Sequence, residues 1–480
     1  MALLAAPAAA ADTAAEPLRA TLAAAFAAIA ERHLEDKPPA ELALWWLRGA
    51  LAADARASAR AVRGRIEVLI GTRVVAAVPA PATPQAAAAA LAALLAEVMP
   101  ASPPLRRAGV HTLLSAGFDE LFAALDPYSR YLTPEQAQAA RDARVGQSGL
   151  GLRIGAGAGG RPVVAVVEPD GPAARAGIRA GDLLLAVDGV PLGASDLSLA
   201  ALLLEGPEGS EAVLRLARGG RGFTAVLLRE RRAAPTLLLD RREEVLLLRL
   251  SGFAEGTAAR VEAALAEAPP GGIVLDLRGN RGGLLAEALA VADAFLEGGP
   301  IGATTGRHPD ANRRWEASGP DLARGRPVVV LVDGRTASAA EVLAAALADG
   351  GRAALIGSGT LGKGLIQMVV PLPGGAEVHL SWSRLLGPRG VPIQGLGVVP
   401  ALCTAFGEAE ARRGLAALAA GRPPMAEALA RAARLRPDAA WEEVRAIRAA
   451  CPPAEGRPAD EALALALLAD PLAYRTALRR

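Results

Sequence analysis

Lysine is nearly absent from this sequence of 480 residues. Of its 52 basic residues only two are lysines, Lys37 and Lys363, and the others are arginines. Arginine stays charged in proteins, whereas a lysine can give up its proton near neutral pH in suitable surroundings. A position that keeps lysine despite this strong bias is therefore a candidate for proton chemistry.

Cysteine, histidine and net charge are scarce as well. The two cysteines, Cys403 and Cys451, are far too few for a disulfide framework and form no C-x-x-C pair. The four histidines lack the spacing of metal ligands, so we expect no metal site. The formal net charge is +2, without a basic or acidic tail, and this balance argues against a nucleic-acid partner.

Long apolar runs are also missing, and the N-terminal apolar segment is short. No run reaches about 18 residues, so we expect no membrane-spanning helix. Ala2–Ala11 is small and apolar, and Ala9-Ala10-Ala11 before Asp12 is similar to a signal-peptidase site, although a positively charged start is missing. We predict that residues 1–11 are a signal peptide. The alternative is the Ala-rich start of a helix, and membrane association stays open.

The sequence patterns divide the remaining chain into four regions. Residues 12–144 have apolar residues at helical spacing and are predicted to be helical. Residues 145–232 contain many glycines and short alternating strands, which indicates a small β-rich domain. Strands alternate with helices in residues 233–405, which favours a mostly parallel sheet, and residues 406–480 return to helices. We therefore predict a multidomain α/β protein.

Two glycine-rich motifs raise the alternative of nucleotide binding. Gly357–Lys363 matches G-x-x-x-x-G-K, but Gly364 stands where Ser or Thr should hold magnesium, and a strand-like segment follows. Gly155–Gly160 matches G-x-G-x-x-G, but a predicted strand follows where a helix should begin. Neither segment offers a helix N-terminus to a phosphate. We expect no nucleotide and no other cofactor.

A serine and a lysine offer a different chemistry. Ser338 lies between a predicted strand at 328–332 and a predicted helix at 339–348, where backbone N–H groups could hold an oxyanion. A serine hydroxyl needs a base, and a lysine can serve when burial favours its neutral form. Lys363, between Gly362 and Gly364, could pack closely in apolar surroundings. The alternative for Ser338 is a simple helix N-cap.

Residues 328–400 resemble the active-site region of the carboxyl-terminal processing peptidases, also called tail-specific proteases. Two motifs carry the resemblance: Ser338-Ala339-Ala340-Glu341, and Leu361-Gly362-Lys363-Gly364-Leu365-Ile366-Gln367. The resemblance implies that Ser338 is the nucleophile and that Lys363, 25 residues later, is the base. It further implies that Gln367 positions the lysine. Positions 363 and 367 would share one face of a strand.

Three further blocks resemble the same family: Asp126–Leu132, Asp276–Leu285 and Gln394–Pro400. The family's oxyanion hole then implies an N–H donor at Gly282 or Gly283 and a second donor at Ala339. The sequence departs from the family pattern where Ala340, Arg281, Leu361 and Ala401 replace Ser, Pro, Phe and Asp. None of these departures removes a proposed catalytic group, so the reaction class is expected to hold.

Residues 145–232 resemble a PDZ domain. Gly149-Leu150-Gly151-Leu152 fits the loop whose backbone binds a C-terminal carboxylate, and Gly171–Asp182 is similar to the region of the ligand-groove helix. The resemblance implies a periplasmic serine endopeptidase that acts on proteins or peptides with apolar C-terminal tails. The sequence identifies no adaptor protein. The alternative is a PDZ scaffold with an inactive peptidase core.

Export has one consequence for the cysteines. Disulfides persist in oxidising compartments such as the periplasm. We therefore predict a disulfide between Cys403 and Cys451.

Overall fold

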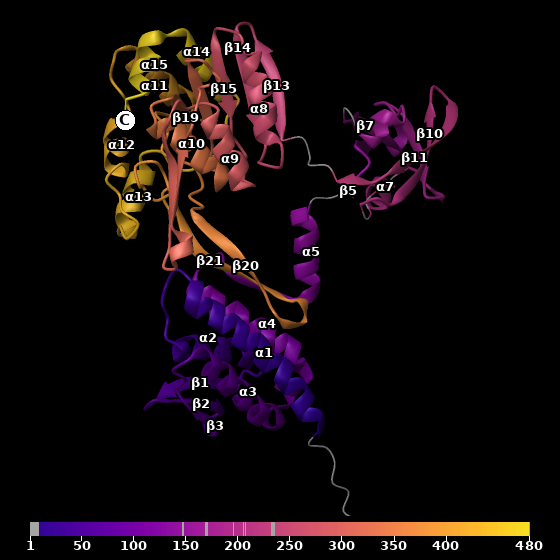
Figure 1. The fold of residues 1–480 in the computed structure, drawn as a ribbon, viewed down its shortest axis with the longest axis vertical. Coiled ribbons are helices and arrows are strands. Elements are labelled where there is room, and N and C mark those ends of the chain that lie inside the picture. The colour runs from indigo at the N-terminus through magenta and orange to yellow at the C-terminus, as the bar shows by residue number, and fades with distance from the viewer. Residues whose placement is uncertain are drawn as a thin grey trace, which may run out of the picture. The chain divides into compact units, whose positions relative to one another are not determined.

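The computed structural model of this chain describes residues 9–145, 148–168, 171–194, 196–204, 206, 208–231 and 236–479. It has two compact units (Figure 1). One joins Met1–Ala137 to Thr236–Arg480, and the other is Gln138–Pro235. The predicted signal peptide lies mostly outside the described residues, and the first described element, α1, begins at Ala9.

A six-stranded sheet forms the centre of the first unit, in the order β13-β14-β15-β18-β19-β22. All neighbours are parallel except β13, which pairs antiparallel with β14 at the edge. The strands are β13 (Leu237–Arg242), β14 (Val245–Leu250), β15 (Gly272–Asp276), β18 (Val328–Val332), β19 (Ala353–Gly357) and β22 (Leu402–Cys403). Every residue of β15, β18 and β19 is buried, as expected for parallel strands with both faces covered. The predicted α/β class is confirmed.

Helices cover both faces of this sheet (Figure 1). One face packs against α8 (Thr257–Ala266), α9 (Leu285–Asp293) and α10 (Ala339–Asp349). The other face packs against α11 (Glu408–Ala419), α14 (Ala459–Ala469) and α15 (Pro471–Ala477). Two further helices of the C-terminal region, α12 (Ala426–Ala432) and α13 (Trp441–Ala449), pack around Cys403 and Cys451.

A second, antiparallel sheet connects the α/β core to the N-terminal region (Figure 1). Its strands are β17 (Arg313–Ala317), β16 (Gly299–Thr305), β21 (Glu377–Leu386) and β20 (Leu365–Pro371), with β4 (Arg130–Leu132) on β21. Near η3 (Pro373–Gly375), the β20–β21 hairpin buries Leu372 and Val378 in the same core as Phe26 and Phe118 of the N-terminal helices. The strand that follows Lys363 is therefore anchored in the N-terminal region.

The N-terminal region contains a sheet that the sequence analysis missed. Its helices are α1 (Ala9–Arg32), α2 (Pro39–Leu51), α3 (Pro84–Ala101) and α4 (Pro103–Leu125), and α5 (Pro134–Val145) follows β4. Between α2 and α3 lie three antiparallel strands, β1 (Ala57–Val62), β2 (Arg65–Ile70) and β3 (Arg73–Pro79). The helical prediction for 12–144 is wrong for these strands. Their signals were alternating aliphatic residues and turn glycines with positive φ, Gly64 at 73° and Gly71 at 61°.

Helix α3 bears on the expectation that no helix spans a membrane. By length and apolar composition this helix of 18 residues could cross a membrane, whereas we expected no such segment. Its inner face, with Leu91, Leu94 and Val98, is buried in the core of the N-terminal region. A helix in the core of a folded domain has the same composition. Length and apolar composition by themselves therefore do not indicate that α3 spans a membrane.

The second unit is a β-rich domain with its own core. Its main sheet has the order β11-β10-β8-β7-β6, with β9 on β8, and β5 pairs with β12. The strands are β5 (Ser148–Gly149), β6 (Leu152–Ala156), β7 (Pro162–Val167), β8 (Leu183–Val187), β9 (Val190–Pro191), β10 (Glu211–Arg218), β11 (Arg221–Leu228) and β12 (Glu230–Arg231). The helical elements are η1 (Ala158–Gly160), α6 (Pro172–Arg175) and α7 (Leu197–Leu204). Strand β6 lies at one edge of the sheet.

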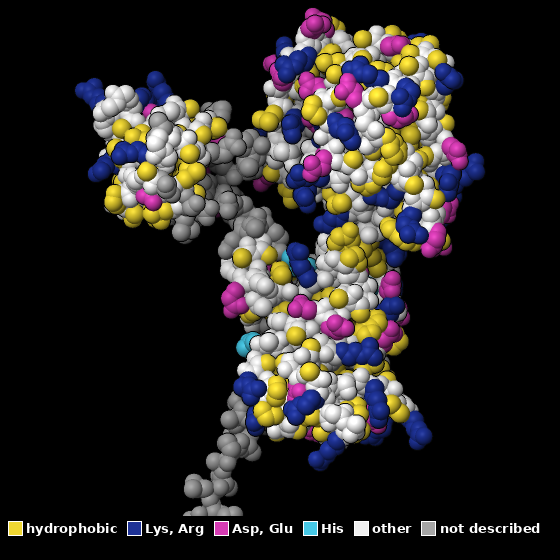
Figure 2. Space-filling view, turned by 180° about the vertical axis from the view of Figure 1, so that it is seen from behind, with side chains coloured by type: hydrophobic (Ala, Val, Ile, Leu, Met, Phe, Trp, Pro, Cys, Tyr) yellow, Lys and Arg dark blue, Asp and Glu magenta, His cyan; other side chains and the backbone are white. Residues whose placement is uncertain are grey.

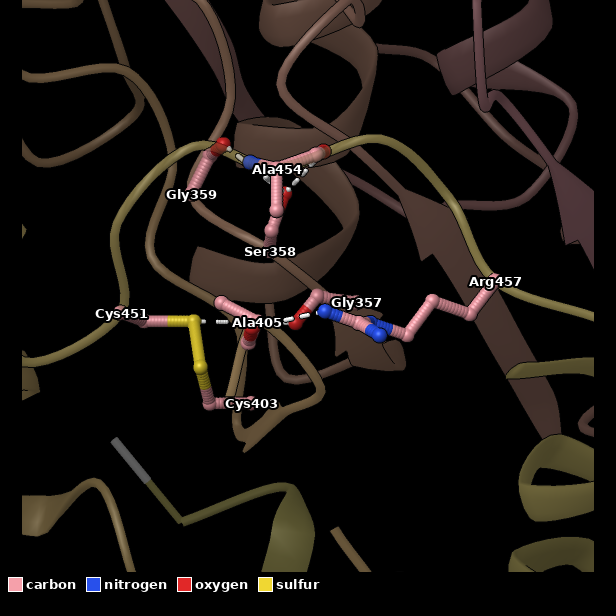
Figure 3. The surroundings of a disulfide bond; sticks show 8 residues. All are labelled: Gly357, Ser358, Gly359, Cys403, Ala405, Cys451, Ala454 and Arg457. Carbon is pink, nitrogen blue, oxygen red and sulfur yellow. Dashed lines mark hydrogen bonds between the residues drawn. A yellow bond between two sulfur atoms is a disulfide. The ribbon is translucent and has the colours of Figure 1, made fainter. Parts of the chain in front are cut away.

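The predicted disulfide between Cys403 and Cys451 is confirmed (Figure 3). It joins the last strand of the central sheet to the segment after α13. The Sγ atom of Cys451 lies 3.6 Å from the carbonyl oxygen of Gly357. The hydroxyl of Ser358 donates to the carbonyl of Ala454 at 2.9 Å and accepts the N–H of the same residue at 3.1 Å. The disulfide therefore holds the C-terminal region against the start of the loop that carries Lys363.

Surface charge does not concentrate on the visible face of the molecule. Figure 2 shows basic and acidic side chains interspersed over that face. This distribution agrees with the small net charge of the sequence.

Candidate active site

Ser338 lies in the turn between β18 and α10, at the carboxyl end of a central parallel strand. Its backbone has φ 59° and ψ −123°, a conformation that is strained for a residue with a side chain. Such a conformation costs roughly 1–3 kcal/mol and persists only where its surroundings fix it. The side chain is half-buried. A sharp, fixed turn of this kind presents a hydroxyl at the edge of the sheet.

Buried hydrogen bonds fix the Ser338 turn. The carboxylate of Asp333 accepts the N–H groups of Gly279, Arg335 and Thr336 at 2.9–3.0 Å. The Thr336 hydroxyl donates to the carbonyl of Leu277 at 2.9 Å. These contacts tie the serine turn to the loop between β15 and α9, which contains the predicted oxyanion residues.

The loop from β15 to α9 approaches Ser338 closely because it contains two glycines. A Cβ atom at Gly282 would lie 2.9 Å from the Cβ of Ser338, and one at Gly283 would lie 2.2 Å from the carbonyl oxygen of Phe253. Both glycines have positive φ, 96° and 141°. Any larger residue would push this loop away from the serine.

The N–H groups of the two glycines differ in their partners. The N–H of Gly282 donates to the side-chain oxygen of Asn280 at 2.8 Å, so it is already used. Within the described part of the chain, the N–H groups of Gly283 and Ala339 donate no hydrogen bond. Gly283 and Ala339 also line one cavity with Ser338. The geometry therefore favours Gly283 over Gly282 as a donor beside Ala339.

Glu341 connects the serine turn to the lysine loop. Its side chain is fully buried on α10. One carboxylate oxygen accepts the N–H groups of Ser338 at 2.8 Å and of Lys363 at 2.9 Å. The other accepts the hydroxyl of Thr360 at 2.5 Å and the N–H of Gly362 at 2.6 Å. A single carboxylate thus fixes the backbone of both predicted catalytic residues.

The surroundings of Glu341 alter its titration. Burial raises the pKa of Glu341 and outweighs the four hydrogen bonds, which lower it. The contact to the Ser338 N–H is also half of a capping box, with the acidic residue three positions after the N-cap. The sequence therefore contained a signal for Glu341, which we quoted in the motif without giving it a role.

Lys363 lies in the loop between β19 and β20, where glycines allow close packing. A Cβ atom at Gly364 would lie 2.2 Å from the backbone nitrogen of Gln394, and the N–H of Gly364 donates to the side chain of Gln394 at 2.9 Å. The next element is strand β20, which supports the sequence argument against a phosphate-binding loop. The glycines beside Lys363 thus allow its loop to pack closely against the loop that contains Gln394.

The side chain of Lys363 is half-buried, so the dry packing suggested by the sequence is not observed. Its Nζ atom lies 5.7 Å from the ring centroid of Tyr128. Tyr128 was part of a recognised sequence block, but nothing in the sequence indicated that it reaches the lysine. This contact becomes visible only in the folded chain.

One cavity brings the predicted catalytic residues together. Its lining includes Ser338, Lys363 and Gln367. The amide nitrogen of Gln367 donates to the carbonyl of Leu365 at 3.3 Å and approaches the hydroxyl of Ser381 at 3.5 Å, rather than contacting Lys363. A register shift between Ile366 and Gln367 breaks the simple alternation on which we relied. The apolar part of the lining is Leu285, Leu365, Ile366 and Leu385.

The predicted carboxylate loop of the second unit precedes edge strand β6. Leu150 is buried and its carbonyl accepts the N–H of Ala173 at 2.9 Å. Gly151 has φ 68°, and a Cβ there would lie 3.0 Å from the Cα of Gly171. Helix α7 packs beside β6, whereas the region 171–182 that we assigned to the groove contains only the four-residue α6. The helix beside edge strand β6 is therefore α7 and not α6.

Comparisons with known proteins identify two domains in the sequence. The sequence matches peptidase family S41 over residues 244–402 and the PDZ domain over residues 163–218. A carboxy-terminal-processing protease of Bartonella bacilliformis is 34% identical over 300 residues, which are 60% of this chain and 68% of that protein. A carboxyl-terminal-processing protease of a Picosynechococcus species is 36% identical over 298 residues, which are 58% and 70% of the two chains. Among solved structures, a photosystem II D1 C-terminal processing protease is 31% identical with a TM-score of 0.39, over 64% of this chain and 85% of that one.

These matches define the chain as a serine peptidase that carries a PDZ domain. The identity to relatives over most of their length is more specific. The chain belongs to the carboxyl-terminal-processing protease family, whose members act on peptides or proteins.

Proposed function

We propose that the chain is a serine endopeptidase in which Ser338 is the nucleophile and Lys363 the general base. The observation that carries this proposal is the cavity shared by Ser338, Lys363, Gly283 and Ala339. The neutral amine of Lys363 takes the proton from the Ser338 hydroxyl, and the oxygen attacks the scissile carbonyl. The lysine ammonium then gives this proton to the leaving amine, and water hydrolyses the acyl-enzyme.

In this proposal, the oxyanion of the tetrahedral intermediate accepts hydrogen bonds from the N–H groups of Gly283 and Ala339. Both N–H groups belong to backbone that is fixed before substrate arrives, by Asp333, Thr336 and the glycine packing. Loss of one such donor costs about 3–4 kcal/mol in related chemistry. Gln367 is proposed to orient Lys363 when substrate is bound, after the amide leaves the carbonyl of Leu365.

The PDZ domain is proposed to bind the C-terminal tail of the substrate. The backbone of Gly149–Leu152 would bind the carboxylate, and the tail would add as a strand beside β6. Support comes from the free edge of β6 and from α7 beside it. We further propose that apolar tails are preferred and that the protein acts after export to the periplasm. The disulfide supports an oxidising compartment.

A digestion series tests this function. An unfolded substrate with an apolar C-terminal tail, and the same substrate with two terminal aspartates, are incubated with the wild type and with Ser338→Ala. We expect cleavage by the wild type only, faster for the apolar tail. Equal inertness of both proteins would favour the alternative of a PDZ scaffold, and equal rates for the two tails would contradict tail recognition.

A further inference from the structure

The amine of Lys363 has an aromatic neighbour that the mechanism above does not use. Its Nζ lies 5.7 Å from the centroid of the Tyr128 ring. Among the residues that the structure describes, this amine donates no hydrogen bond to Ser338 or Gln367. A ring face attracts a cation but not a neutral amine, so the contact favours the ammonium form. The same amine must be neutral to act as a base.

Asp126 fixes the turn that presents Tyr128. One oxygen of the Asp126 carboxylate accepts the N–H groups of Tyr128 at 2.8 Å and of Ser129 at 2.9 Å. The other oxygen accepts the hydroxyl of Ser129. Three bonds to consecutive residues leave this turn little freedom. The ring of Tyr128 is therefore held in place by the backbone on which it sits.

The same carboxylate reaches two other elements. Its oxygens contact the Nε2 atom of His33, directly after α1, at 3.1 Å, and accept the hydroxyl of Ser381 on β21, at 2.8 Å. His33 is buried, with 1% of its surface exposed. Burial raises the pKa of Asp126, but the bonds from His33, Ser129 and the turn N–H groups outweigh it and lower the pKa to about 2. The carboxyl group of Asp126 is therefore ionised at neutral pH.

Ser381 leads from this carboxylate to the predicted lysine-positioning residue. Ser381 and Gln367 are directly paired across β20 and β21. The amide nitrogen of Gln367 lies 3.5 Å from the hydroxyl of Ser381. One buried carboxylate therefore supports the two groups that compete for Lys363, the ring of Tyr128 and the amide of Gln367.

We propose that Tyr128 is a positioning residue for Lys363. In the enzyme without substrate, the ring of Tyr128 holds the ammonium form of the lysine. When the lysine loses its proton, the neutral amine leaves the ring. This inference rests on the proposed role of Lys363 as the base. Asp126, with His33 behind it, acts by fixing Tyr128. The proton leaves to water, and the freed amine turns to Gln367 and Ser338.

Among the described residues, the charged or titratable groups on the elements next to Lys363 include Glu341, Asp126 and His33, and each has hydrogen-bond partners. On α10 the carboxylate of Glu341 binds backbone N–H groups, including that of Lys363 itself. On the turn after α4 the carboxylate of Asp126 is bonded as described, and His33, which directly follows α1, contacts Asp126. Tyr128 contacts the amine directly through its ring, so its removal should change the surroundings of Lys363.

The scarcity of lysine makes this contact measurable. Protein labelled with ¹³C at the lysine ε-carbon gives two signals, from Lys37 and Lys363, and Lys363→Arg assigns them. We expect the ε-protons of Lys363 to be shifted upfield by the Tyr128 ring. In Tyr128→Leu this upfield shift should disappear, because the ring that causes it is gone. Tyr128→Phe, which keeps the ring, should behave as the wild type, and Lys37 is the internal control.

Activity provides the second readout. In Tyr128→Leu the acid limb of the kcat/KM profile should move to lower pH, because no ring favours the ammonium form of the base. An unchanged signal and an unchanged limb in Tyr128→Leu would overturn the proposal. If the wild type cleaved nothing while the signal of Lys363 responded as expected, the proposed function would fail and the contact would stand.

A matched pair of variants tests Asp126. Asp126→Asn should reduce the ring shift at Lys363. Asp54→Asn removes another buried carboxylate, bonded to Arg56 and Ser102, and should leave Lys363 unchanged. Unfolding midpoints of both variants show how far each loses stability. A loss of stability in Asp126→Asn without any change at Lys363 would contradict its positioning role.

Discussion

The two proposed sites of this molecule are built in opposite ways. At the reaction site, buried side chains such as Glu341 and Asp333 fix the backbone around Ser338 and Lys363. At the peptide site, backbone bonds hold the loop 149–152, such as those from Ala173 to Leu150 and from Glu168 to Gly151, and β6 lies at the edge of its sheet. A reaction needs fixed atoms, whereas a strand that adds to an edge needs free ones. Substitutions should therefore act on kcat in the first site and on KM in the second.

The largest effect is expected for the lysine. Lys363→Arg keeps the charge but removes the proton acceptor, because arginine stays protonated. We expect kcat/KM for the apolar-tail substrate to fall by about 10⁴-fold or more, with an unchanged unfolding midpoint. Cleavage within tenfold of the wild type would mean that another group is the base.

The disulfide should have the next largest effect, on stability. It closes a loop with a sequence separation of 48 residues, for which chain entropy suggests about 4 kcal/mol. Cys403→Ser with Cys451→Ser should lower the free energy of unfolding of the first unit by up to this amount. Because the segment at Ala454 braces Ser358, kcat should fall several-fold as well. Denaturant unfolding with and without reductant, beside steady-state kinetics, measures both effects.

Glu341→Gln tests how the reaction site is held. An amide would place an NH₂ group against N–H donors and leave at least one bond unmade, at a cost of about 1–3 kcal/mol. We expect kcat to fall about 10–100-fold while KM stays within threefold. A change in KM alone would show that Glu341 does not position the serine and lysine.

The smallest effect is expected in the PDZ domain. Gly151→Ala places a Cβ on a residue with φ 68° and 3.0 Å from the Cα of Gly171, which should distort the carboxylate loop. KM for the apolar-tail substrate should rise about tenfold, a loss of about 1.4 kcal/mol, with kcat unchanged. Gly149→Ala is the control, because its Cβ would meet nothing within 4 Å. If KM in Gly151→Ala is as low as in Gly149→Ala, the loop 149–152 does not take part in recognition of the tail.

The regular parts of the fold could be predicted from local pattern. Val328–Val332 is a strand with the predicted bounds, since a run of aliphatic residues between turns leaves little choice. The sheet at 57–79 was missed because its strands are short and half-exposed and lie between long helices. A single helical prediction for residues 12–144 left out the alternating aliphatic residues and turn glycines at 57–79.

The active-site residues that belong to sequence motifs could be predicted. The contacts between segments that are distant in the sequence could not. Ser338 and Lys363 belong to motifs and share one cavity in the structure. The choice of Gly283 over Gly282 depends on which N–H Asn280 occupies, and no spacing reveals that. Tyr128 reaches Lys363 only because the N-terminal region packs on the β20–β21 hairpin. Such contacts follow from tertiary packing alone.

The most direct test of the central claim is the mass of the enzyme during a single turnover. Rapid mixing with an activated peptide ester and acid quenching should show an acyl group on Ser338 in the wild type. The acyl group should be absent in Ser338→Ala, and its formation should be slower by several orders of magnitude in Lys363→Arg. Acylation of Lys363→Arg at the wild-type rate, or of a residue other than Ser338, would contradict the account.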